Sequence, residues 1–286
     1  MVKIVRKQVL NPSVTLLEVE APRIARKAQA GQFIILRLDG PGERIPLTIA
    51  DYDREKGTVT IIFQKVGLTT QLLADLSEGD CIQDFVGPLG LPTELPEGAG
   101  RICVVGGGVG CAIAYPQAKS CHAAGLEVDV IAGFRSRDIV ILEDEFKAVS
   151  DHCYIMTDDG SYGEKGFVTV KLQELIDAGA KYDAVIAIGP IPMMKFVSQV
   201  TRPYGIKTIV SLNPIMIDGT GMCGGCRVTV GGKMKFACVD GPDFDGHEVD
   251  FDELMNRNAV YRAQEAEEKG RHDCRMDQLA HELIGH

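Results

Sequence analysis

Four side chains that commonly bind metals lie within a short stretch of the sequence, IDGTGMCGGCRVTVGGKMKFAC. Asp218 is followed by Cys223, Cys226 and Cys238. Thiolates and carboxylates both coordinate transition metals, and four glycines between positions 219 and 225 suit a loop that folds tightly around a bound group. The stretch therefore predicts a metal centre in which an aspartate stands where a fourth sulfur would be expected.

The spacing of these ligands favours one kind of metal centre. With a cysteine at position 218 the pattern would be C-x4-C-x2-C followed by a distant cysteine, the spacing of plant-type [2Fe–2S] ferredoxins. We therefore predict a [2Fe–2S] cluster bound by Asp218, Cys223, Cys226 and Cys238. A zinc site is the alternative, since cysteine and aspartate also complete a zinc tetrahedron. Free thiols beside an aspartate that only shapes a turn are a further alternative.

A second candidate site is the glycine-rich sequence VVGGGVGCAIAY, which follows an expected strand and opens an expected helix. Glycines let the backbone approach a pyrophosphate, and the helix offers free N–H groups and the positive end of its dipole. The spacing departs from the GxGxxG of standard dinucleotide folds. A purely structural turn is the alternative, but we predict nucleotide binding by Gly107, Gly108, Val109 and Gly110.

Three further loops follow expected parallel strands, and such loops meet at the ligand-binding edge of a sheet. The loop GFRSRD carries basic residues where a ribose or its 2′-phosphate would lie, so charge alone does not choose between NAD(H) and NADP(H). The other loops are TDDGSYGEKGFVT and AIGPIPMM. From the three loops we predict nucleotide contacts at Arg135, Asp158, Asp159, Gly160, Gly189, Pro190 and Met193.

Two motifs near the N-terminus have residues suited to a flavin. The sequence GERIPLTIAD offers an arginine for a phosphate and an apolar pair to lie under a flat ring, and QKVGLTTQLL offers free N–H groups at the start of a helix. Each alone also fits ordinary turn chemistry. Taken together, they predict flavin contacts at Arg44, Pro46, Leu47, Thr48, Gln64, Gly67, Thr69 and Thr70.

The pattern of apolar residues divides the chain into parts that would position these sites. Residues 1–97 contain short β-rich segments broken by turns, which predicts an antiparallel barrel. Residues 98–212 alternate strand-like and helix-like segments, which predicts a parallel sheet with helices on both faces. We expect a metal-binding segment at residues 213–250 and a charged helical tail at 251–286, either solvated or docked on a partner.

Composition excludes several classes of function. The 286-residue chain has a net charge of −10, which argues against nucleic acid as a partner because phosphate binding needs clustered basic residues. No apolar run is long enough to span a membrane, and no export signal begins the chain, so we expect a cytoplasmic protein. The nine cysteines are too scattered for a disulfide framework.

The order of these motifs resembles the ferredoxin reductase superfamily, in which a flavin-binding barrel precedes a nicotinamide-binding domain. The flavin motif of that superfamily, Arg-x-Tyr-Ser/Thr, is altered here: Leu47 stands for the tyrosine, Thr48 for the serine, and Arg44 lies one place further upstream. The second flavin motif, Gly-x-Gly-Thr, appears here as Gly67-Leu68-Thr69-Thr70, and GPIPMM resembles the Cys-Gly-Pro-x-x-Met segment, with Ile188 replacing its cysteine.

A C-terminal iron–sulfur stretch makes two families within the superfamily the nearest relatives. They are the small subunits of bifurcating NADH-dependent reduced ferredoxin:NADP oxidoreductases and the electron-transfer subunits of dihydroorotate dehydrogenase. The resemblance implies FAD, a [2Fe–2S] cluster and NAD(H) as cofactors, with NADP(H) not excluded. It also implies a larger flavin and iron–sulfur partner subunit, with ferredoxin as an indirect partner. An aspartate among three cysteines is the ligand set of the first family.

Three functions are compatible with these patterns. The first is an electron-transfer subunit of a bifurcating oxidoreductase, and the second is the electron-transfer subunit of dihydroorotate dehydrogenase or of another flavoenzyme. In both, hydride from the nicotinamide reaches FAD and single electrons pass through the cluster to the partner. The third is a non-enzymatic nucleotide-binding module with zinc at the cysteine stretch. No constellation suited to hydrolysis is apparent.

Overall fold

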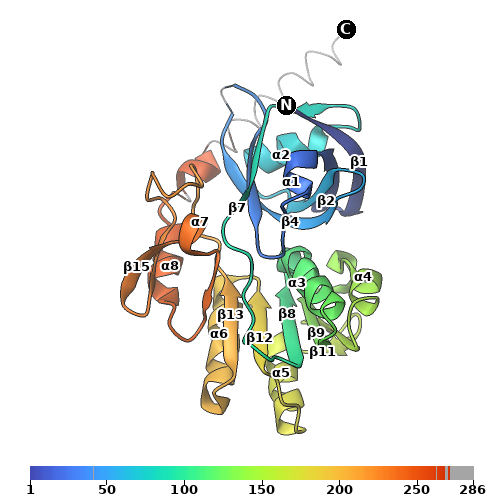
Figure 1. Cartoon of the computed structure of the whole chain (residues 1–286), viewed down its shortest axis with the longest axis vertical. Coiled ribbons are helices and arrows are strands. Elements are labelled where there is room, and N and C mark those ends of the chain that lie inside the picture. Colours follow the sequence, from blue (N-terminus) through green and yellow to red (C-terminus); the bar gives the residue numbers. More distant parts are fainter. Residues whose placement is uncertain (41, 262, 268–269, 271–286) are drawn as a thin grey trace.

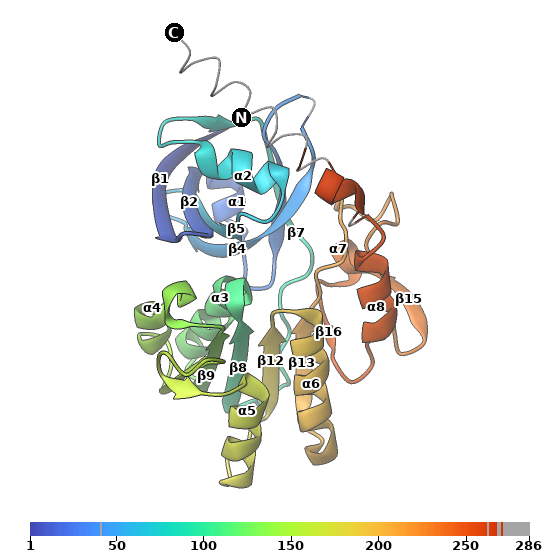
Figure 2. The same ribbon diagram turned by 180° about the vertical axis from the view of Figure 1, so that it is seen from behind.

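Two sheets form the body of the molecule, as Figure 1 shows for the computed structural model. The structure describes residues 1–40, 42–261, 263–267 and 270. The N-terminal residues form a seven-stranded antiparallel barrel, and the following residues form a seven-stranded sheet flanked by helices. The cysteine-rich segment, residues 213–250, lies beside both parts, and Figure 2 shows the same arrangement from behind. The predicted fold class is confirmed.

The barrel has the strand order β6-β1-β2-β5-β4-β3-β7. Its core is built by side chains such as Leu17, Ile34 and Phe63, which are almost fully buried. The bounds of its elements are β1 (Val2–Asn11), β2 (Val14–Glu20), α1 (Pro22–Ala25), β3 (Phe33–Arg37), β4 (Ile45–Asp53), β5 (Thr58–Gln64), α2 (Leu68–Asp75), β6 (Cys81–Ile82) and β7 (Asp84–Leu89).

The second sheet has the order β11-β10-β9-β8-β12-β13-β16. Its elements are β8 (Arg101–Gly107), α3 (Cys111–Ala123), β9 (Glu127–Phe134), α4 (Glu143–Lys147), β10 (His152–Thr157), β11 (Glu164–Lys165), α5 (Val168–Asp177), β12 (Ala184–Ile188), α6 (Ile191–Thr201), β13 (Lys207–Ser211) and β16 (Asp243–Asp245). Three short 3-10 helices accompany them, η1 (Gly108–Gly110), η2 (Arg137–Ile139) and η3 (Arg202–Tyr204).

The central strands of this sheet are mostly apolar, as expected of strands that helices cover on both faces, although β8 begins with Arg101 and β9 contains Glu127 and Asp129. Along β8, Ile102 and Val104 pack in one core with α3 and α4. Cys103 and Val105 point the other way, into a core with α5, α6 and a C-terminal helix, α8 (Phe251–Asn258). The amphipathic helix α5 buries Val168, Leu172 and Ile176, which are four residues apart. The predicted placement of helices on both faces is therefore confirmed.

The cysteine-rich segment is more regular than its sequence suggests. It contains a hairpin of β14 (Arg227–Val230) and β15 (Lys233–Phe236), followed by α7 (Ala237–Asp240). Gly231 and Gly232 turn this hairpin with φ angles of 58° and 71°. The segment then adds β16 to the edge of the second sheet, antiparallel to β13. The sheet is therefore mixed rather than purely parallel, because β16 pairs with the otherwise open edge of β13.

The C-terminal tail is only partly described. Helix α8 buries Phe251 and Leu254, so its first turns pack on the body of the protein rather than standing free in solvent. Residues 263–267 and 270 are helical, whereas residues 262, 268–269 and 271–286, which we also expected to be helical, lie outside the described residues. Among the helices that the structure describes, none combines the length and the apolar character needed to span a membrane.

Candidate functional site

Two of the three predicted cysteine ligands lie side by side in the cysteine-rich segment. Cys226 precedes β14 and Cys238 lies in α7, and both are buried. Their Sγ atoms are 3.2 Å apart, which is well beyond a disulfide bond of about 2 Å. Cys223 is exposed on the loop before them. Burial and the neighbouring Cys226 thiol raise the pKa of Cys238 to about 12, so a bound cation is needed for both sulfurs to act as thiolates.

The loop around Cys223 is arranged to stabilise a thiolate. The Gly225 N–H donates to Cys223 Sγ over 3.5 Å, and the Asp218 N–H faces the same sulfur. These N–H groups lower the pKa of the Cys223 thiol below its usual value. Gly219, Gly221 and Gly224 have φ angles of 82°, 83° and 66°, a conformation that a residue with a side chain rarely adopts. The glycines are thus needed for the loop that aims N–H groups at the sulfur.

Asp218 is partly exposed, and its carboxylate is held by its own turn. Its Oδ2 atom accepts hydrogen bonds from the Thr220 N–H at 3.0 Å, from the Thr220 hydroxyl and from the Met222 N–H at 3.3 Å. The bonds from Thr220 are the main reason why the pKa of Asp218 lies below its usual value, and the positive charge of Arg44 adds to them. The group is therefore an ionised carboxylate at neutral pH, as a metal ligand must be.

The four predicted ligands fit a two-metal cluster better than one zinc ion. Ligands of a single zinc ion must all lie within about 4 Å of one another, because each bond is about 2.0–2.3 Å long. Among the described residues, one group of three or more His, Cys, Asp or Glu side chains has all its ligand atoms within 4.8 Å of one another, and it consists of Glu127, Asp129 and His152. The four predicted cluster ligands do not form such a group. Cys226 and Cys238 lie side by side, whereas Asp218 and Cys223 lie earlier on the loop that precedes β14 and are not grouped with them, as suits a cluster of two iron atoms.

The cysteine pair packs directly against the barrel. Cys226 and Cys238 share a small core with Phe33 and Ile35 of β3. Strand β3 pairs with β4, so that Phe33 lies opposite Thr48 and Ile35 lies opposite Pro46. The half-buried residues Pro46, Leu47 and Thr48, which we predicted to contact a flavin, are therefore one strand away from the predicted cluster ligands. The two predicted sites are therefore neighbours in the fold.

The structure gives Arg44 a contact that differs from the expected phosphate. Its Nε atom donates to the carbonyl oxygen of Ile217 at 2.9 Å, and Nη2 donates to that of Asp218 at 3.3 Å. At the start of α2, the Thr69 hydroxyl donates to the carboxylate of Glu43 at 2.6 Å. The N–H of Gly67 is bonded to the Thr70 hydroxyl at 3.0 Å. A pyrophosphate at this helix would thus have to replace contacts that the chain makes with itself.

A cavity of about 1010 Å³ is lined by both the barrel and the second sheet. Pockets for cofactors commonly have volumes of this order. The barrel contributes residues from the turn between β1 and β2 and from the end of β5, and the sheet contributes the loops after β8, β9, β10 and β12. Of the predicted contacts, those that line it are Gln64, Gly107, Gly108, Val109, Gly110, Arg135, Asp158, Gly189, Pro190 and Met193.

Glycine is required where two of these loops meet. A Cβ atom on Gly110 would lie 2.5 Å from the carbonyl oxygen of Ile188 and 2.7 Å from Cα of Gly189. One on Gly107 would lie 2.4 Å from Sδ of Met193. The bare backbone therefore lets the turn after β8 and the loop after β12 form one wall of the cavity, open to a nucleotide along its glycine backbone. The residues present fit a dinucleotide.

Other predicted contacts lie outside this cavity, and some residues that line it were not expected. Asp159 is bonded to the Ser161 N–H at 2.9 Å and to its hydroxyl, which shapes the loop, and Gly160 lies on the same loop. Cavity residues missed from the sequence include Asn11 and Ser13. The sequence feature that could have pointed to them is the turn NPSV between two strands, in which the Asn11 side chain accepts a hydrogen bond from the Ser13 N–H.

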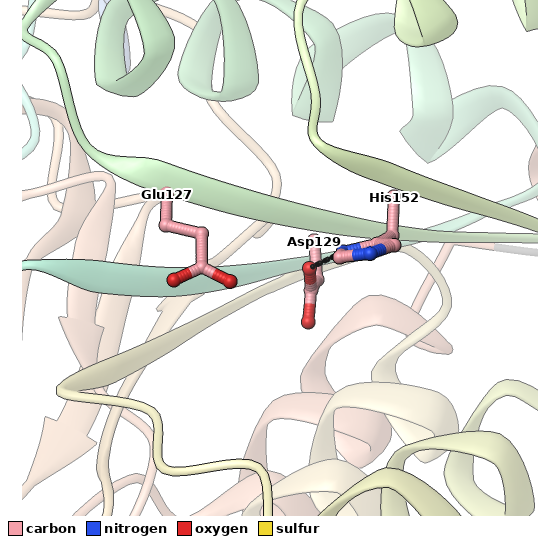
Figure 3. A group of neighbouring side chains, drawn as sticks. All are labelled: Glu127, Asp129 and His152. Atoms are coloured by element: carbon pink, nitrogen blue, oxygen red, sulfur yellow. Dashed lines mark hydrogen bonds and ion pairs between the residues drawn. The ribbon is translucent and has the colours of Figure 1, made fainter.

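The group of Glu127, Asp129 and His152 lies at the opposite edge of the second sheet, at the starts of β9 and β10 (Figure 3). Burial raises the pKa of Asp129, but hydrogen bonds from Tyr182, Arg101 and His152 outweigh it and hold the pKa below its usual value. The guanidinium of Arg101 is 2.8 Å from the Asp129 carboxylate. A cation is thus already supplied by the chain, and the group is a structural ion pair rather than a metal site.

Comparisons with known proteins agree with this arrangement. Residues 213–250 match the family model described as the iron-sulfur cluster binding domain of dihydroorotate dehydrogenase B. A dihydroorotate dehydrogenase B (NAD(+)) electron transfer subunit homolog of Thermotoga maritima is 49% identical over 92% of this chain and 92% of its own. The dihydroorotate dehydrogenase B (NAD(+)) electron transfer subunit of Geobacillus thermodenitrificans is 34% identical over 82% of this chain and 91% of its own.

A solved structure is similar over nearly its whole length. A chain from the structure of an NADH-dependent reduced ferredoxin-NADP oxidoreductase, described for its insights into flavin-based electron bifurcation, is 47% identical with a TM-score of 0.89. The match covers 95% of this chain and 97% of that chain. The predicted resemblance is confirmed: the chain belongs to the family of dihydroorotate dehydrogenase B electron-transfer subunits and their homologues, and it is an electron-transfer subunit of an NAD(H)-dependent flavin and iron–sulfur oxidoreductase.

Proposed function

We propose that the chain is the small subunit of an electron-bifurcating NADH-dependent reduced ferredoxin:NADP oxidoreductase. The observation that carries this proposal is the 47% identity to a chain of such an enzyme over 95% of this chain. Asp218 supports it, because an aspartate beside three cysteines is the ligand set that the resemblance implies for this family. Such a subunit works with a larger partner that holds further redox centres, and it reaches ferredoxin only through that partner.

Each group would be held by a different part of the chain. Pro46, Leu47 and Thr48 on β4 would support the flavin ring, and the cavity between barrel and sheet would hold NAD(H) against Gly107, Gly110 and Gly189. Asp218, Cys223, Cys226 and Cys238 would bind the [2Fe–2S] cluster. We propose NAD(H) rather than NADP(H), since the similar enzyme is NADH-dependent.

The chain contributes position and shielding rather than acid–base chemistry. FAD held by these residues would supply hydride acceptance from NADH and release of single electrons, and a [2Fe–2S] cluster held by the four ligands would supply one-electron transfer. The glycine residues that line the cavity would hold the nucleotide between the two sheets. Strand β3 lies between the cluster cysteines and β4, the strand proposed to support the flavin ring. The two buried sulfurs lie on the barrel side, while Cys223 and Met222 are exposed, with Met222 87% accessible. Electrons can therefore leave toward a partner.

Spectroscopy of the anaerobically purified protein tests this function. We expect flavin absorption bands together with the broad iron–sulfur shoulder, and a paramagnetic signal of one reduced [2Fe–2S] cluster per chain after addition of NADH. A control preparation of Cys238→Ser should keep the flavin bands and lose the cluster signal. A colourless protein that contains zinc would refute the proposal and favour the nucleotide-binding zinc module.

The second candidate function is the electron-transfer subunit of a dihydroorotate dehydrogenase. The family model matched by residues 213–250 and the names of the relatives in Thermotoga maritima and Geobacillus thermodenitrificans favour it. Co-purification separates the two, because one partner oxidises dihydroorotate and the other contains iron–sulfur centres and exchanges electrons with ferredoxin. Recovery of a dihydroorotate-oxidising partner would replace the first proposal by the second.

A further inference from the structure

Arg44 connects two parts of the proposed electron path that are far apart in the sequence. It immediately precedes β4, the strand proposed to support the flavin ring, and its side chain reaches the turn that bears Asp218. The two residues joined by the shorter bond are 173 positions apart, and this bond uses the Nε atom of Arg44 and the carbonyl oxygen of Ile217. No other residue of the 42–45 stretch makes a described hydrogen bond to the cysteine-rich segment.

The peptide unit that Arg44 binds also faces a cluster ligand. The carbonyl oxygen of Ile217 and the N–H of Asp218 belong to the same planar unit and point in opposite directions. Arg44 binds the carbonyl end at 2.9 Å, and the N–H end faces the sulfur of Cys223. A cation on one end of a peptide polarises the donor at its other end. The charge of Arg44 is therefore relayed to the sulfur of Cys223.

The turn that bears Asp218 is also pressed against the barrel at the next residue. A Cβ atom on Gly219 would lie 2.5 Å from Cδ1 of Ile35 and 3.0 Å from Cδ1 of Leu89. The backbone at Gly219 thus touches the barrel wall while Arg44 holds the two preceding carbonyls. Arg44 and Gly219, together with Met216, which packs in the same core as Phe33 and Ile35, hold the turn against the barrel.

We propose that Arg44 is a positioning residue that holds the turn bearing Asp218 against the barrel and raises the reduction potential of the cluster. This inference rests on the proposed function, since it requires a cluster at Cys223. It does not require Asp218 to be a ligand. Reduction of the cluster adds a negative charge, which a nearby guanidinium and stronger N–H···S hydrogen bonds both stabilise. Both effects of Arg44 therefore act in the same direction.

The test compares Arg44→Gln with Arg44→Lys in the intact complex, by redox titration followed through the paramagnetic signal of the cluster. Glutamine removes the charge and the fork of donors, so we expect a lower midpoint potential and a changed spectrum, with iron content retained. Lysine keeps the charge but cannot reproduce the planar fork of guanidinium donors, so we expect a smaller shift in potential and a changed spectrum. Arg6→Gln is the control, because Arg6 is an exposed residue of β1 bonded to Gln8.

The possible outcomes separate this inference from the proposed function. A wild-type protein without a cluster signal would refute the proposed function itself. If both Arg44 variants have the same cluster potential and spectrum as the wild type, the inference about Arg44 is wrong and the proposed function still stands. Loss of flavin with an unchanged cluster would also overturn it, by assigning Arg44 to a flavin phosphate. If Arg44→Gln does not yield folded protein, Arg44→Lys decides, because an unchanged spectrum in that variant contradicts the positioning role.

Discussion

The carboxylate of Asp243 is buried where the barrel, the second sheet and the cysteine-rich segment meet. Asp243 opens β16 and pairs across the sheet with Ser211 of β13. Its Oδ2 atom accepts a hydrogen bond from the Thr93 hydroxyl, which in turn accepts one from Gln117 of α3 at 2.6 Å. Although part of the residue is accessible, its Oδ1 atom is buried and has no hydrogen bond of normal geometry. We predict that Asp243→Asn stabilises the protein at neutral pH.

The magnitude follows from the shift in pKa. Burial raises the pKa of Asp243 from 3.8 to about 6, against the opposing effect of the Ser211 and Thr93 hydroxyls. The folded state therefore binds its proton more tightly than the unfolded state, and the stability that this supplies is complete below pH 3.8 and is lost as the pH rises through about 6. The loss amounts to about 3 kcal/mol at pH 7 and about half of that at pH 5.

An asparagine keeps the shape of the side chain without a charge to bury. Its amide oxygen can accept the Thr93 hydrogen bond, and its NH2 group supplies a donor at the position of Oδ1. Compared with the wild type, Asp243→Asn should raise the urea midpoint clearly at pH 7.5, to a smaller extent at pH 4.5 and little at pH 3.5. The difference should grow as the pH rises from 3.8 and level off above about 6. Asp243→Ala, which also removes the charge but leaves the Thr93 hydroxyl without this acceptor, is the control and should be less stable than Asp243→Asn at every pH.

A difference between Asp243→Asn and the wild type that does not vary from pH 4.5 to 8 would refute the reasoning. It would mean that the carboxyl group has the same pKa in the folded and the unfolded chain. The comparison of two variants at each pH removes the contribution of all other titrating groups, because these are common to both proteins. Infrared spectroscopy gives an independent check. The wild type should show a band of a protonated carboxyl group that disappears as the pH rises through about 6, and Asp243→Asn should lack this band.

Three further predictions concern the sites. Asp218→Cys should retain the cluster but change its potential and paramagnetic spectrum, because a thiolate is a softer ligand than a carboxylate; an unchanged spectrum would mean that Asp218 is not a ligand. Gly110→Ala should abolish flavin reduction by NADH without loss of flavin, since its Cβ would lie 2.5 Å from the carbonyl oxygen of Ile188, whereas Gly40→Ala, with no atom within 4 Å, should behave as wild type in stopped-flow assays. Asp129→Ala should lower the free energy of unfolding by about 1–3 kcal/mol, because it leaves the Tyr182 hydroxyl and part of the Arg101 guanidinium unpaired. Glu127→Ala removes an exposed carboxylate and should lower it clearly less in the same urea titration. Equal losses in the two variants would contradict the ion-pair interpretation.

Local patterns made most of the fold predictable. The amphipathic repeat of Val168, Leu172 and Ile176 defines a helix wherever it packs, and the apolar run of β8 requires cover on both faces. The hairpin β14–β15 was missed, although the Gly-Gly pair at 231–232 between two short β segments is a recognised turn signal. Strand β16 carried no such signal, because its three residues become a strand only by pairing with the edge of β13.

The sequence by itself determined the kinds of chemistry that this protein can perform. The spacing of Asp218, Cys223, Cys226 and Cys238, and the glycines before α3, are local features, and the geometry of a metal loop or of a phosphate-binding turn depends on neighbours only a few residues apart. Only the tertiary structure decided which groups meet. The contact of Arg44 with the turn at Asp218 and the burial of the Asp243 carboxylate join segments that are more than a hundred residues apart. No spacing in the sequence encodes such contacts, because they arise from the packing of whole sheets against each other.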